Sequence, residues 1–326
     1  MGGMARNVPE NYRMCPMISY LTNDCIDKTR WDDCVAHAVN GNVYVWSWYL
    51  DVVHPGWEAL VEIEDDKYLT IMPITRKKKY MIDYLCQPFF VQQLGVFSRL
   101  PITEETTLGF LRAIPKKYRL VEIRLNEQNP LPNACKGVDW HRNHLLDLNK
   151  DYNLLYSDYH ENTKRNLKKS FNYGLELVKG VDVQQVIKLF RDNRGAAIKH
   201  WGDAEYERLR LLTERSLTSS NAFVYGIKTS ENNEIICGAI FMKSHQRITF
   251  LFSGNNAKGK ETQAMTFLID QVIREYAAQP LTLDFEGSDD ENLARYYHGF
   301  GAQQVLYPSF TYRLFNPLCY FSCLIV

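Results

Sequence analysis

The chain has 326 residues, of which 45% are hydrophobic and 23% are charged, a composition typical of a soluble globular protein with about two domains. Lysine and arginine together number 38, as do aspartate and glutamate, so the formal charge is zero and no overall basic excess attracts nucleic acid or an anionic membrane. No apolar run approaches the ~20 residues that a membrane-spanning helix needs.

The eight cysteines are scattered along the chain, with no C-x-x-C pair and no Cys/His cluster at the spacing of a zinc site. This pattern predicts reduced thiols and no bound metal. The first residues, MGGMARNVPE, contain no apolar segment of the secretory type. We therefore expect a cytoplasmic protein without a metal centre.

Residues 18–148 alternate between helix-like and strand-like segments. Helices are predicted where apolar residues recur every three or four positions, and strands where short β-branched and aromatic runs lie between turn residues. The charged segment 64–67 is predicted to be a hairpin turn. The expected helices are 29–39 and 103–114, and the expected strands are 43–48, 57–61, 68–73, 82–85, 91–97, 120–124 and 144–148.

Two segments of this half, 44–57 and 84–93, are rich in aromatic and amide side chains. One interpretation is an ordinary strand core with its edges. The other is a groove between two domains, a common place for a pocket. Amides within an apolar run need hydrogen-bond partners, which keeps the second interpretation open. The candidate groove residues are Trp48, Tyr49, Gln87 and Gln92.

The second half begins near residues 149–151. A helix is predicted over 154–172, and its basic residues Lys164 and Arg165 could meet a phosphate or carboxylate or could form a solvated face. The other predicted elements are helices at 181–198 and 205–217, with a break over 194–202, and a hairpin of strands 223–228 and 235–242.

Residues 247–302 form the stretch around which the chain is organised. The expected order is strand 248–252, polar loop 253–260, helix 262–278 with Thr262 as N-cap, strand 281–285, and helix 290–300 with Gly301 as C-cap. Free amides at a helix N-terminus that follows a strand form an anion site, the usual place for a phosphate. The candidate cofactor-binding residues are Phe252, Ser253, Gly254, Asn255, Asn256, Lys258, Gly259, Lys260 and Thr262.

The segment NLARYYHGFGA resembles the A-x-x-x-Y-x-K-x-G-F helix that closes acyltransferases of the GNAT superfamily. Ala294, Tyr297 and Gly301 occupy the corresponding positions, although Ala302 replaces the phenylalanine of that pattern. The pyrophosphate signature Q/R-x-x-G-x-G/A is matched only in part, by residues 256–261.

Two further segments are similar to the Fem-like branch of the superfamily: LDFEGS at residues 283–288, and the basic helix that begins at Ser157. The resemblance implies an α/β (mixed α+β) fold of two tandem GNAT-like domains, each a mixed, mainly antiparallel twisted sheet flanked by helices. We expect a degenerate first domain over 1–148 that has lost its cofactor site, an acyltransferase domain over 149–316, and a tail over 317–326.

Glu286 and Tyr297 are the candidate catalytic residues. An amine of pKa about 10.4 must lose a proton to attack a thioester, and a carboxylate at a strand end can accept that proton. Tyr297 matches the tyrosine of the family, which implies a general acid for the departing thiolate. Glu286 could instead cap the following helix or form a salt bridge. The resemblance also places His200 and Trp201 at the border of the acceptor site.

The favoured function is therefore N-acyl transfer from an acyl-CoA, with acetyl-CoA as the expected cofactor, to a small-molecule amine bound near the inter-domain groove. A Fem-like aminoacyltransferase using aminoacyl-tRNA is the alternative, disfavoured by the zero formal charge and by the lack of a long heptad segment. A third possibility is a binding protein that kept this fold and lost the activity. The oligomeric state has no sequence signal.

Overall fold

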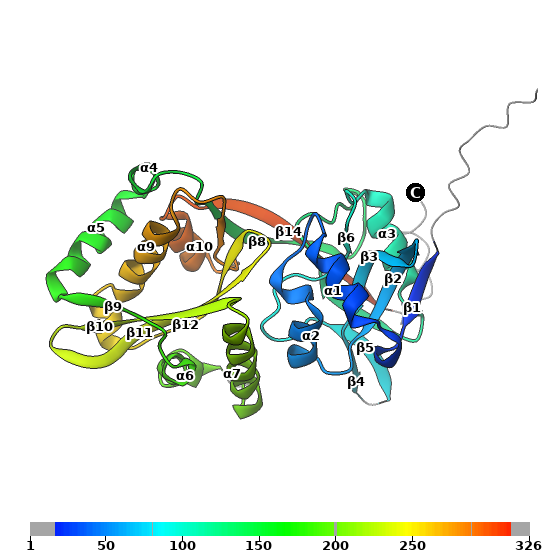
Figure 1. Cartoon of the computed structure of the whole chain (residues 1–326), viewed down its shortest axis with the longest axis horizontal. Helices are drawn as coiled ribbons and strands as arrows, with labels where there is room; N and C mark the ends of the chain where they lie inside the picture. Colours follow the sequence, from blue (N-terminus) through cyan, green and yellow to red (C-terminus); the bar gives the residue numbers. More distant parts are fainter. Residues whose placement is uncertain (1–16, 80, 199–200, 288, 314–326) are drawn as a thin grey trace, which may run out of the picture.

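The computed structural model describes residues 17–79, 81–198, 201–287 and 289–313, which form two lobes joined by long strands (Figure 1). The N-terminal lobe contains β1 (Ile18–Leu21), α1 (Lys28–Ala36), α2 (Ser47–Val53), β2 (Glu58–Glu64), β3 (Lys67–Ile74), β4 (Arg76–Lys79), β5 (Ile82–Cys86), β6 (Phe97–Ser98), α3 (Glu104–Ala113) and β7 (Leu120–Arg124). The joining strands are β8 (Val138–Asp147) and β14 (Gln303–Arg313).

The C-terminal lobe contains the remaining elements. They are α4 (Tyr152–Ser157), α5 (Glu161–Ser170), β9 (Leu175–Lys179), α6 (Val183–Arg191), α7 (Asp203–Thr218), β10 (Ala222–Thr229), β11 (Asn232–Ser244), β12 (Arg247–Asn255), α8 (Ala257–Glu261), α9 (Ala264–Tyr276), β13 (Thr282–Asp284) and α10 (Glu291–His298).

One ten-stranded sheet runs through both lobes in the order β4-β5-β7-β14-β8-β13-β12-β11-β10-β9, and a four-stranded sheet, β1-β2-β3-β6, completes the N-terminal lobe. Only β5–β7 and β12–β13 pair in parallel within these sheets, and the other neighbours are antiparallel. The predicted mixed, mainly antiparallel α/β fold is thereby confirmed. Because β14 lies between β7 and β8, the sheet continues across the proposed domain boundary near residue 148.

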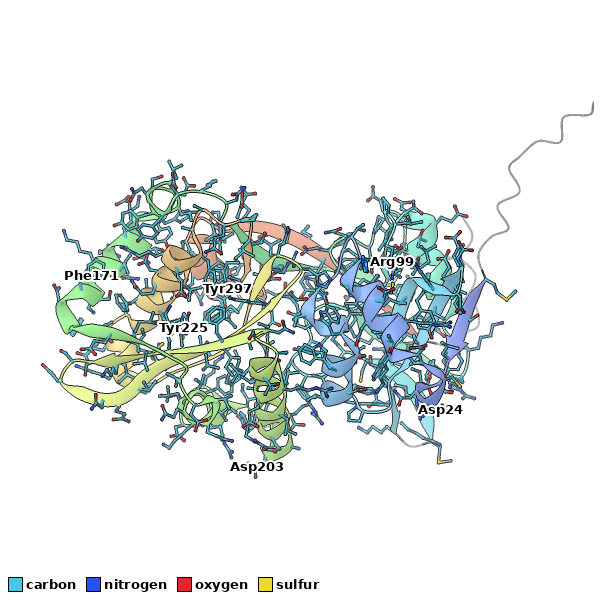
Figure 2. The ribbon with its side chains drawn as sticks, in the orientation of Figure 1. Asp24, Arg99, Phe171, Asp203, Tyr225 and Tyr297 are labelled. Atoms are coloured by element: carbon cyan, nitrogen blue, oxygen red, sulfur yellow. The ribbon has the colours of Figure 1, made fainter. Side chains whose placement is uncertain are left out.

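Helices cover both faces of the sheet in the C-terminal lobe. Helices α5, α9 and α10 lie on one face, and α6 and α7 lie on the other (Figure 1). The hydrophobic core under α6 and α7 continues into the N-terminal lobe, where it includes Trp31, Tyr44 and Leu50. Polar contacts also cross between the lobes: Trp46 Nε1 donates to Ser244 Oγ at 2.9 Å. Figure 2 shows Tyr297 inside the C-terminal lobe and Phe171 at its periphery.

Local sequence explains several boundaries. Asp65 and Asp66 both have positive φ, 46° and 61°, as the tight turn between β2 and β3 requires. The carboxylate of Asp290 accepts from the backbone N–H groups of Asn292 and Leu293 and caps the start of α10, whereas the helix ends with Gly299, and not the predicted Gly301, as its C-cap. The predicted helix 103–114 is α3, capped by Thr103. The tail over 317–326 lies outside the described residues.

Two predictions for the N-terminal lobe were wrong. Residues 43–48 are a 3₁₀ turn followed by the start of α2, because Asn42 caps the turn and the Asp32 carboxylate accepts from the N–H and hydroxyl of Ser47. Residues 91–97 form an irregular segment with a single parallel bridge, Leu94 to Leu125, and only the short β6. Positive φ at Phe90 and Gly95 interrupts a regular strand there.

Two helices of the second half were predicted too long. The segment 154–172 is divided into α4 and α5, because the chain turns at residues 158–160 and His160 N–H donates to the carbonyl of Gly299. The segment 181–198 holds only α6, which ends at Arg191 and is followed by a 3₁₀ turn at Gly195–Ala197. The edge strand β9 was not predicted.

The predicted polar loop 253–260 also differs. Its first three residues continue β12, and the next residues form the short helix α8, in which the Asn256 side chain accepts from Gly259 N–H. Thr262 is not the N-cap of the following helix. Its hydroxyl donates back to the carbonyl of Lys258 at 2.9 Å, and Gln263, with φ of 60°, precedes α9.

Candidate functional site

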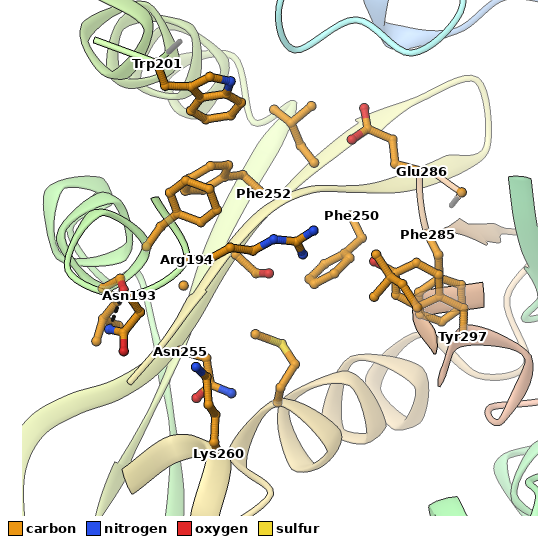
Figure 3. A pocket seen from close by; sticks show the side chains of 18 residues that line it. Asn193, Arg194, Trp201, Phe250, Phe252, Asn255, Lys260, Phe285, Glu286 and Tyr297 are labelled. Carbon is orange, nitrogen blue, oxygen red and sulfur yellow. Dashed lines mark hydrogen bonds between the residues drawn. The ribbon is translucent and has the colours of Figure 1, made fainter. Parts of the chain in front are cut away.

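The candidate site lies where two parallel strands separate. β12 and β13 pair at three positions only, the last being Thr249 with Asp284. β13 then ends, while β12 continues to Asn255 with β11 on its other side. Backbone groups of β12 on the open side therefore face space instead of a strand. A cavity of about 570 Å³ fills this opening (Figure 3).

The wall of this first cavity is aromatic at one end and polar at the other. Trp201 and Phe252 stand at one end, while Asn255 and Lys260 stand at the other, with Arg194 between them (Figure 3). The full lining is Leu189, Phe190, Asn193, Arg194, Trp201, Phe250, Leu251, Phe252, Ser253, Gly254, Asn255, Lys260, Met265, Phe285, Glu286, Gly287, Leu293 and Tyr297.

Three polar groups on residues that line this cavity have no hydrogen-bond or ion-pair partner within the described residues. Among the described residues, the side chains of Arg194 and Lys260 form neither a hydrogen bond nor an ion pair. Asn255 Oδ1 is buried without a hydrogen-bond partner in the described chain. A buried amide oxygen without a partner is costly, so the cavity offers two cations to a ligand and has one unpaired acceptor within its wall.

Glu286 lies directly after β13 at a positive φ of 56°. Its N–H donates to Asp284 Oδ1 at 2.8 Å, and its carboxylate accepts from the hydroxyl of Tyr44 in the other lobe at 2.5 Å. Burial raises the pKa of Glu286 to about 8, with the nearby charge of Asp284 adding to the rise and the Tyr44 hydrogen bond opposing it. Glu286 can therefore exchange a proton near neutral pH.

Asp284, which positions Glu286, is itself fixed by a network across the lobes. Arg247 Nη1 donates to Asp284 Oδ2 at 2.8 Å, and Asn143 Nδ2 donates to Asp284 Oδ1 at 3.0 Å. The other end of the Arg247 guanidinium donates to Glu127 at 2.6 Å. Asp284 thus remains a buried, paired carboxylate, while the Glu286 carboxylate carries no ion pair in the described chain.

Tyr297 reaches the first cavity from α10. Its ring stacks on Phe285, with centroids 4.7 Å apart, and meets the ring of Phe250 at an edge. The hydroxyl has no hydrogen-bond partner among the described residues, although only 6% of the residue is exposed. Burial raises the pKa of Tyr297, so it is a weaker acid than a free tyrosine and a neutral donor near pH 7.

A second cavity of about 370 Å³ adjoins the first on the side of the N-terminal lobe. The two cavities share Trp201, Leu251, Phe252, Glu286 and Gly287. The other lining residues of the second cavity are Phe90, Val91, Gln92, Arg124, Arg142, Asp289 and Tyr307. Glu286 thus stands at the boundary between a cavity within one lobe and a cavity between the lobes.

The predicted cofactor residues divide into two groups. Phe252, Ser253, Gly254, Asn255 and Lys260 line the first cavity. The remaining four are not part of its lining and belong to α8 and its caps: Asn256, Lys258, Gly259 and Thr262. A Cβ at Gly259 would lie 2.5 Å from the carbonyl oxygen of Ile236, so its packing within the fold explains this glycine.

The predicted substrate residues also divide. Trp201 lines both cavities and Gln92 lines the second. Tyr49 lies behind the second cavity, where its hydroxyl donates to the carbonyl of Phe90, and the ring of Trp48 packs on Tyr49. The side-chain amide of Gln87 holds the loop by bonding Val91 O and Arg124 N–H.

Lys164 and Arg165 lie on α5, away from both cavities. Lys164 donates to the carbonyl of Ser157 at 3.0 Å, and Arg165 donates to Asn162 at 2.5 Å, so both serve local contacts. His200 lies outside the described residues.

Sequence reasoning missed Tyr44, Arg194 and Arg124. Tyr44 is 242 positions from its partner Glu286, so no local spacing could connect them. Arg194 is the first residue of the predicted break at 194–202, which was a usable signal. Within the described residues, no group of three or more His, Cys, Asp or Glu side chains could hold a metal ion. None of the described helices has the length and apolarity that crossing a membrane requires.

No family model and no curated protein matches this sequence. Solved structures do resemble the chain. The crystal structure of FemX superposes with a TM-score of 0.62 at 11% identity, over 90% of this chain and 97% of FemX. A conserved protein of unknown function from Bacteroides thetaiotaomicron VPI-5482 gives a TM-score of 0.55 at 10% identity, over 90% and 99% of the two chains.

A tandem GNAT protein from the clavulanic acid biosynthesis pathway gives a TM-score of 0.51 at 9% identity, over 92% of this chain and 99% of that protein. Identities this low establish the fold and leave the activity to be argued from the site. Since the matched regions span both lobes, the chain has a tandem GNAT-like fold of the Fem type.

Proposed function

We propose that the protein is an N-acyltransferase that moves an acyl group from a thioester in the first cavity to an amine in the second. One observation carries the proposal: Glu286, a carboxyl whose pKa is raised to about 8, stands on the boundary shared by the two cavities. We retain residues 149–316 as the proposed acyltransferase domain and 1–148 as a degenerate copy.

Each of the two candidate catalytic residues has a role in the proposed reaction. The amine nitrogen attacks the thioester carbonyl carbon, a C–N bond forms, and the C–S bond breaks. Glu286 accepts the proton that the amine loses. The Tyr297 hydroxyl donates a hydrogen bond to the sulfur as it becomes a thiolate. Because burial raises the pKa of Tyr297, we assign the final protonation of the thiolate to solvent, which also takes the proton from Glu286.

The lining of the first cavity fits acetyl-CoA or another acyl-CoA, which would supply the activated thioester. The open edge of β12 at Phe252–Gly254 would bond the amide groups of its arm, as a neighbouring strand would. Asn255 Oδ1 would accept from an amide N–H, which removes the cost of its burial. Arg194 and Lys260 would meet its phosphates.

The test is thermal unfolding and calorimetric titration with acetyl-CoA and CoA. A ligand at a hundred times its Kd adds about 2.7 kcal/mol to the stability of the folded state. Lys260→Met should weaken binding, because Lys260 lines the cavity. Lys258→Met is the matched control, since Lys258 lies two residues away and pairs with Glu261. Equal weakening by both variants would argue against the proposed site.

Aminoacyl-tRNA is the second candidate donor. The similarity to FemX and the exposed basic strand β4, with the sequence RKKK at the edge of the sheet, favour it. It predicts no thermal shift with millimolar CoA and a shift with aminoacyl-tRNA. The absence of a shift with either donor would instead indicate a binding protein without transferase activity.

A further inference from the structure

The second cavity contains two arginines in different situations. Arg142 is engaged: Nη1 donates to Glu291 at 2.9 Å and Nη2 donates to the carbonyl of Asp289 at 2.9 Å. Arg124, at the end of β7, has no hydrogen-bond or ion-pair partner for its guanidinium within the described residues. Its forked N–H groups match a carboxylate in shape and charge.

Two more donors of this cavity are unused. Gln92 is 7% exposed, and its Oε1 accepts from Gln93, but its amide nitrogen has no partner among the described residues. Tyr307 is 4% exposed, and its hydroxyl also has no hydrogen-bond partner among the described residues. Together with Arg124, these groups give the cavity three donors without a partner in the described chain, a set that can hydrogen-bond an anionic ligand.

The acidic side of the cavity is different. Asp289 is engaged, because its carboxylate accepts from the N–H of Arg142 and bonds the ring of His141. The side-chain carboxyl of Glu286 forms a single hydrogen bond, with Tyr44, and no ion pair within the described chain. The cavity therefore presents one available carboxyl and a set of donors, with Phe90, Trp201 and Phe252 as its apolar wall.

We propose that the second cavity binds an α-amino acid, with its amine at Glu286, its carboxylate at Arg124, and its side chain against the aromatic wall. Gln92 and Tyr307 complete the contacts to the carboxylate. A cavity of about 370 Å³ lies at the small end of ligand pockets, which suits a molecule of this size. The reaction of this ligand rests on the proposed acyl transfer, whereas its binding does not.

The chemistry is self-consistent. The α-amine forms the new C–N bond and gives its proton to Glu286, while the carboxylate is unchanged by the reaction. The product is an N-acyl amino acid, which keeps its contact with Arg124 but has lost the positive charge that faced Glu286. Loss of that attraction favours release of the product.

The experiment is calorimetric titration of the full chain with each of the standard L-amino acids. The best ligand is then compared with the amine that lacks only its carboxylate, such as phenethylamine for phenylalanine or isoamylamine for leucine. The amine should bind at least about tenfold more weakly, because a charged hydrogen-bonded pair is lost. Arg124→Met should weaken the amino acid to the level of the amine and leave the amine unchanged.

Arg119→Met is the matched control, because Arg119 is an exposed arginine just before the same strand and lines neither cavity. Its amino acid affinity should equal that of the wild type. Binding of no amino acid, equal binding of acid and amine, or unchanged binding in Arg124→Met would each overturn the proposal. CoA titration is measured separately: amino acid binding without CoA binding would refute acyl-CoA as the donor and retain the amino acid site.

Discussion

Each lobe contains a parallel backbone pairing with a helix between its two segments in sequence, and the N-terminal lobe has the parallel pair β5–β7 in addition. In the N-terminal lobe, Leu94 bridges Leu125 in parallel with α3 between them in sequence. In the C-terminal lobe, β12 pairs in parallel with β13 with α9 between them. In both, the pairing is short and the strands then separate. The two sites differ in what occupies the space between the separated segments.

Two side-chain amides close the N-terminal opening at Val96, and one of them is Asn40, whose Nδ2 donates to the carbonyl of Val96 at 2.8 Å. Asn129 Oδ1 accepts from Val96 N–H, and Asn129 Nδ2 donates to the carbonyl of Val96, both at 2.8 Å. Gly95 passes so close, at φ of 90°, that a Cβ there would lie 2.3 Å from Asn129 Oδ1. The corresponding part of β12 instead borders a cavity. Side-chain amides can thus replace a ligand as the partners of an open strand edge.

The largest expected effect is on kcat and comes from substitution of Glu286, the acidic residue next to the parallel pairing of the C-terminal lobe. Glu286→Gln should lower kcat about 10³-fold with acetyl-CoA and the amine, since it removes the proton acceptor. In the wild type the rate should rise with pH and level off above about 8, the pKa of Glu286. Steady-state rates measured from about pH 6 to about pH 9, a range that brackets this pKa, would show the rise and the plateau.

Stability provides an independent readout of the same residue. Because folding raises the pKa of Glu286 from 4.5 to about 8, the unfolded chain loses this proton first and stability falls as pH rises between those values. Glu286→Gln should abolish this decline. Glu122→Gln, on the exposed face of β7, is the control for both readouts. An unchanged pH profile in Glu286→Gln would remove Glu286 from the mechanism.

Asn129→Ala should weaken the closure of the N-terminal opening. It leaves the buried N–H of Val96 without a partner, whereas the carbonyl of Val96 keeps the hydrogen bond from Asn40 Nδ2, so the loss is about 2 kcal/mol of unfolding free energy. Urea denaturation would measure the loss. Asn133→Ala, at an exposed position nearby, should change stability by less than about 0.5 kcal/mol. Equal effects of the two substitutions would mean that Asn129 does not close the opening.

Tyr297→Phe should lower kcat about 10²-fold and leave KM nearly unchanged, because the hydroxyl acts on the leaving sulfur and forms no hydrogen bond within the described residues. The aromatic stack on Phe285 is retained in this variant. A rise in KM at constant kcat would instead assign Tyr297 to substrate binding.

Ser253→Phe tests whether filling the C-terminal opening makes it resemble the N-terminal one. The ring should occupy part of the cavity and weaken acetyl-CoA binding at least about tenfold in calorimetry. Ser253→Ala keeps the space and should bind as the wild type does. Ser253 is a better position than Gly259, where any side chain would collide with the backbone at Ile236. Normal binding by Ser253→Phe would place the donor elsewhere.

The smallest effect is expected from Lys164→Met and Arg165→Met. Lys164 bonds to the carbonyl of Ser157 at the end of α4 and Arg165 bonds to Asn162 on α5, so KM for either substrate should change less than about twofold. A large change in steady-state KM would move the acceptor site to α5.

The sequence predicted the long amphipathic elements and the motif around Tyr297 because their signals are local. Predictions failed where a distant side chain decides the backbone, as at Ser47, which is held by Asp32. The same applies to the site. Glu286 follows a recognisable strand end, and Tyr297 lies on a helix with a recognisable motif. Tyr44 and Arg124 instead reach the site only through the packing of the two lobes.

The position of β14 bears on how this protein is made. Tyr312 on β14 donates to the carbonyl of Tyr118, 194 positions earlier in the sequence. During synthesis, β7 and β8 therefore cannot pair with β14, which lies between them, until nearly all of the described chain has left the ribosome. Such distant pairing slows folding and exposes strand edges meanwhile. The two lobes are thus coupled in their maturation, and a half expressed alone would lack a strand from the middle of its sheet.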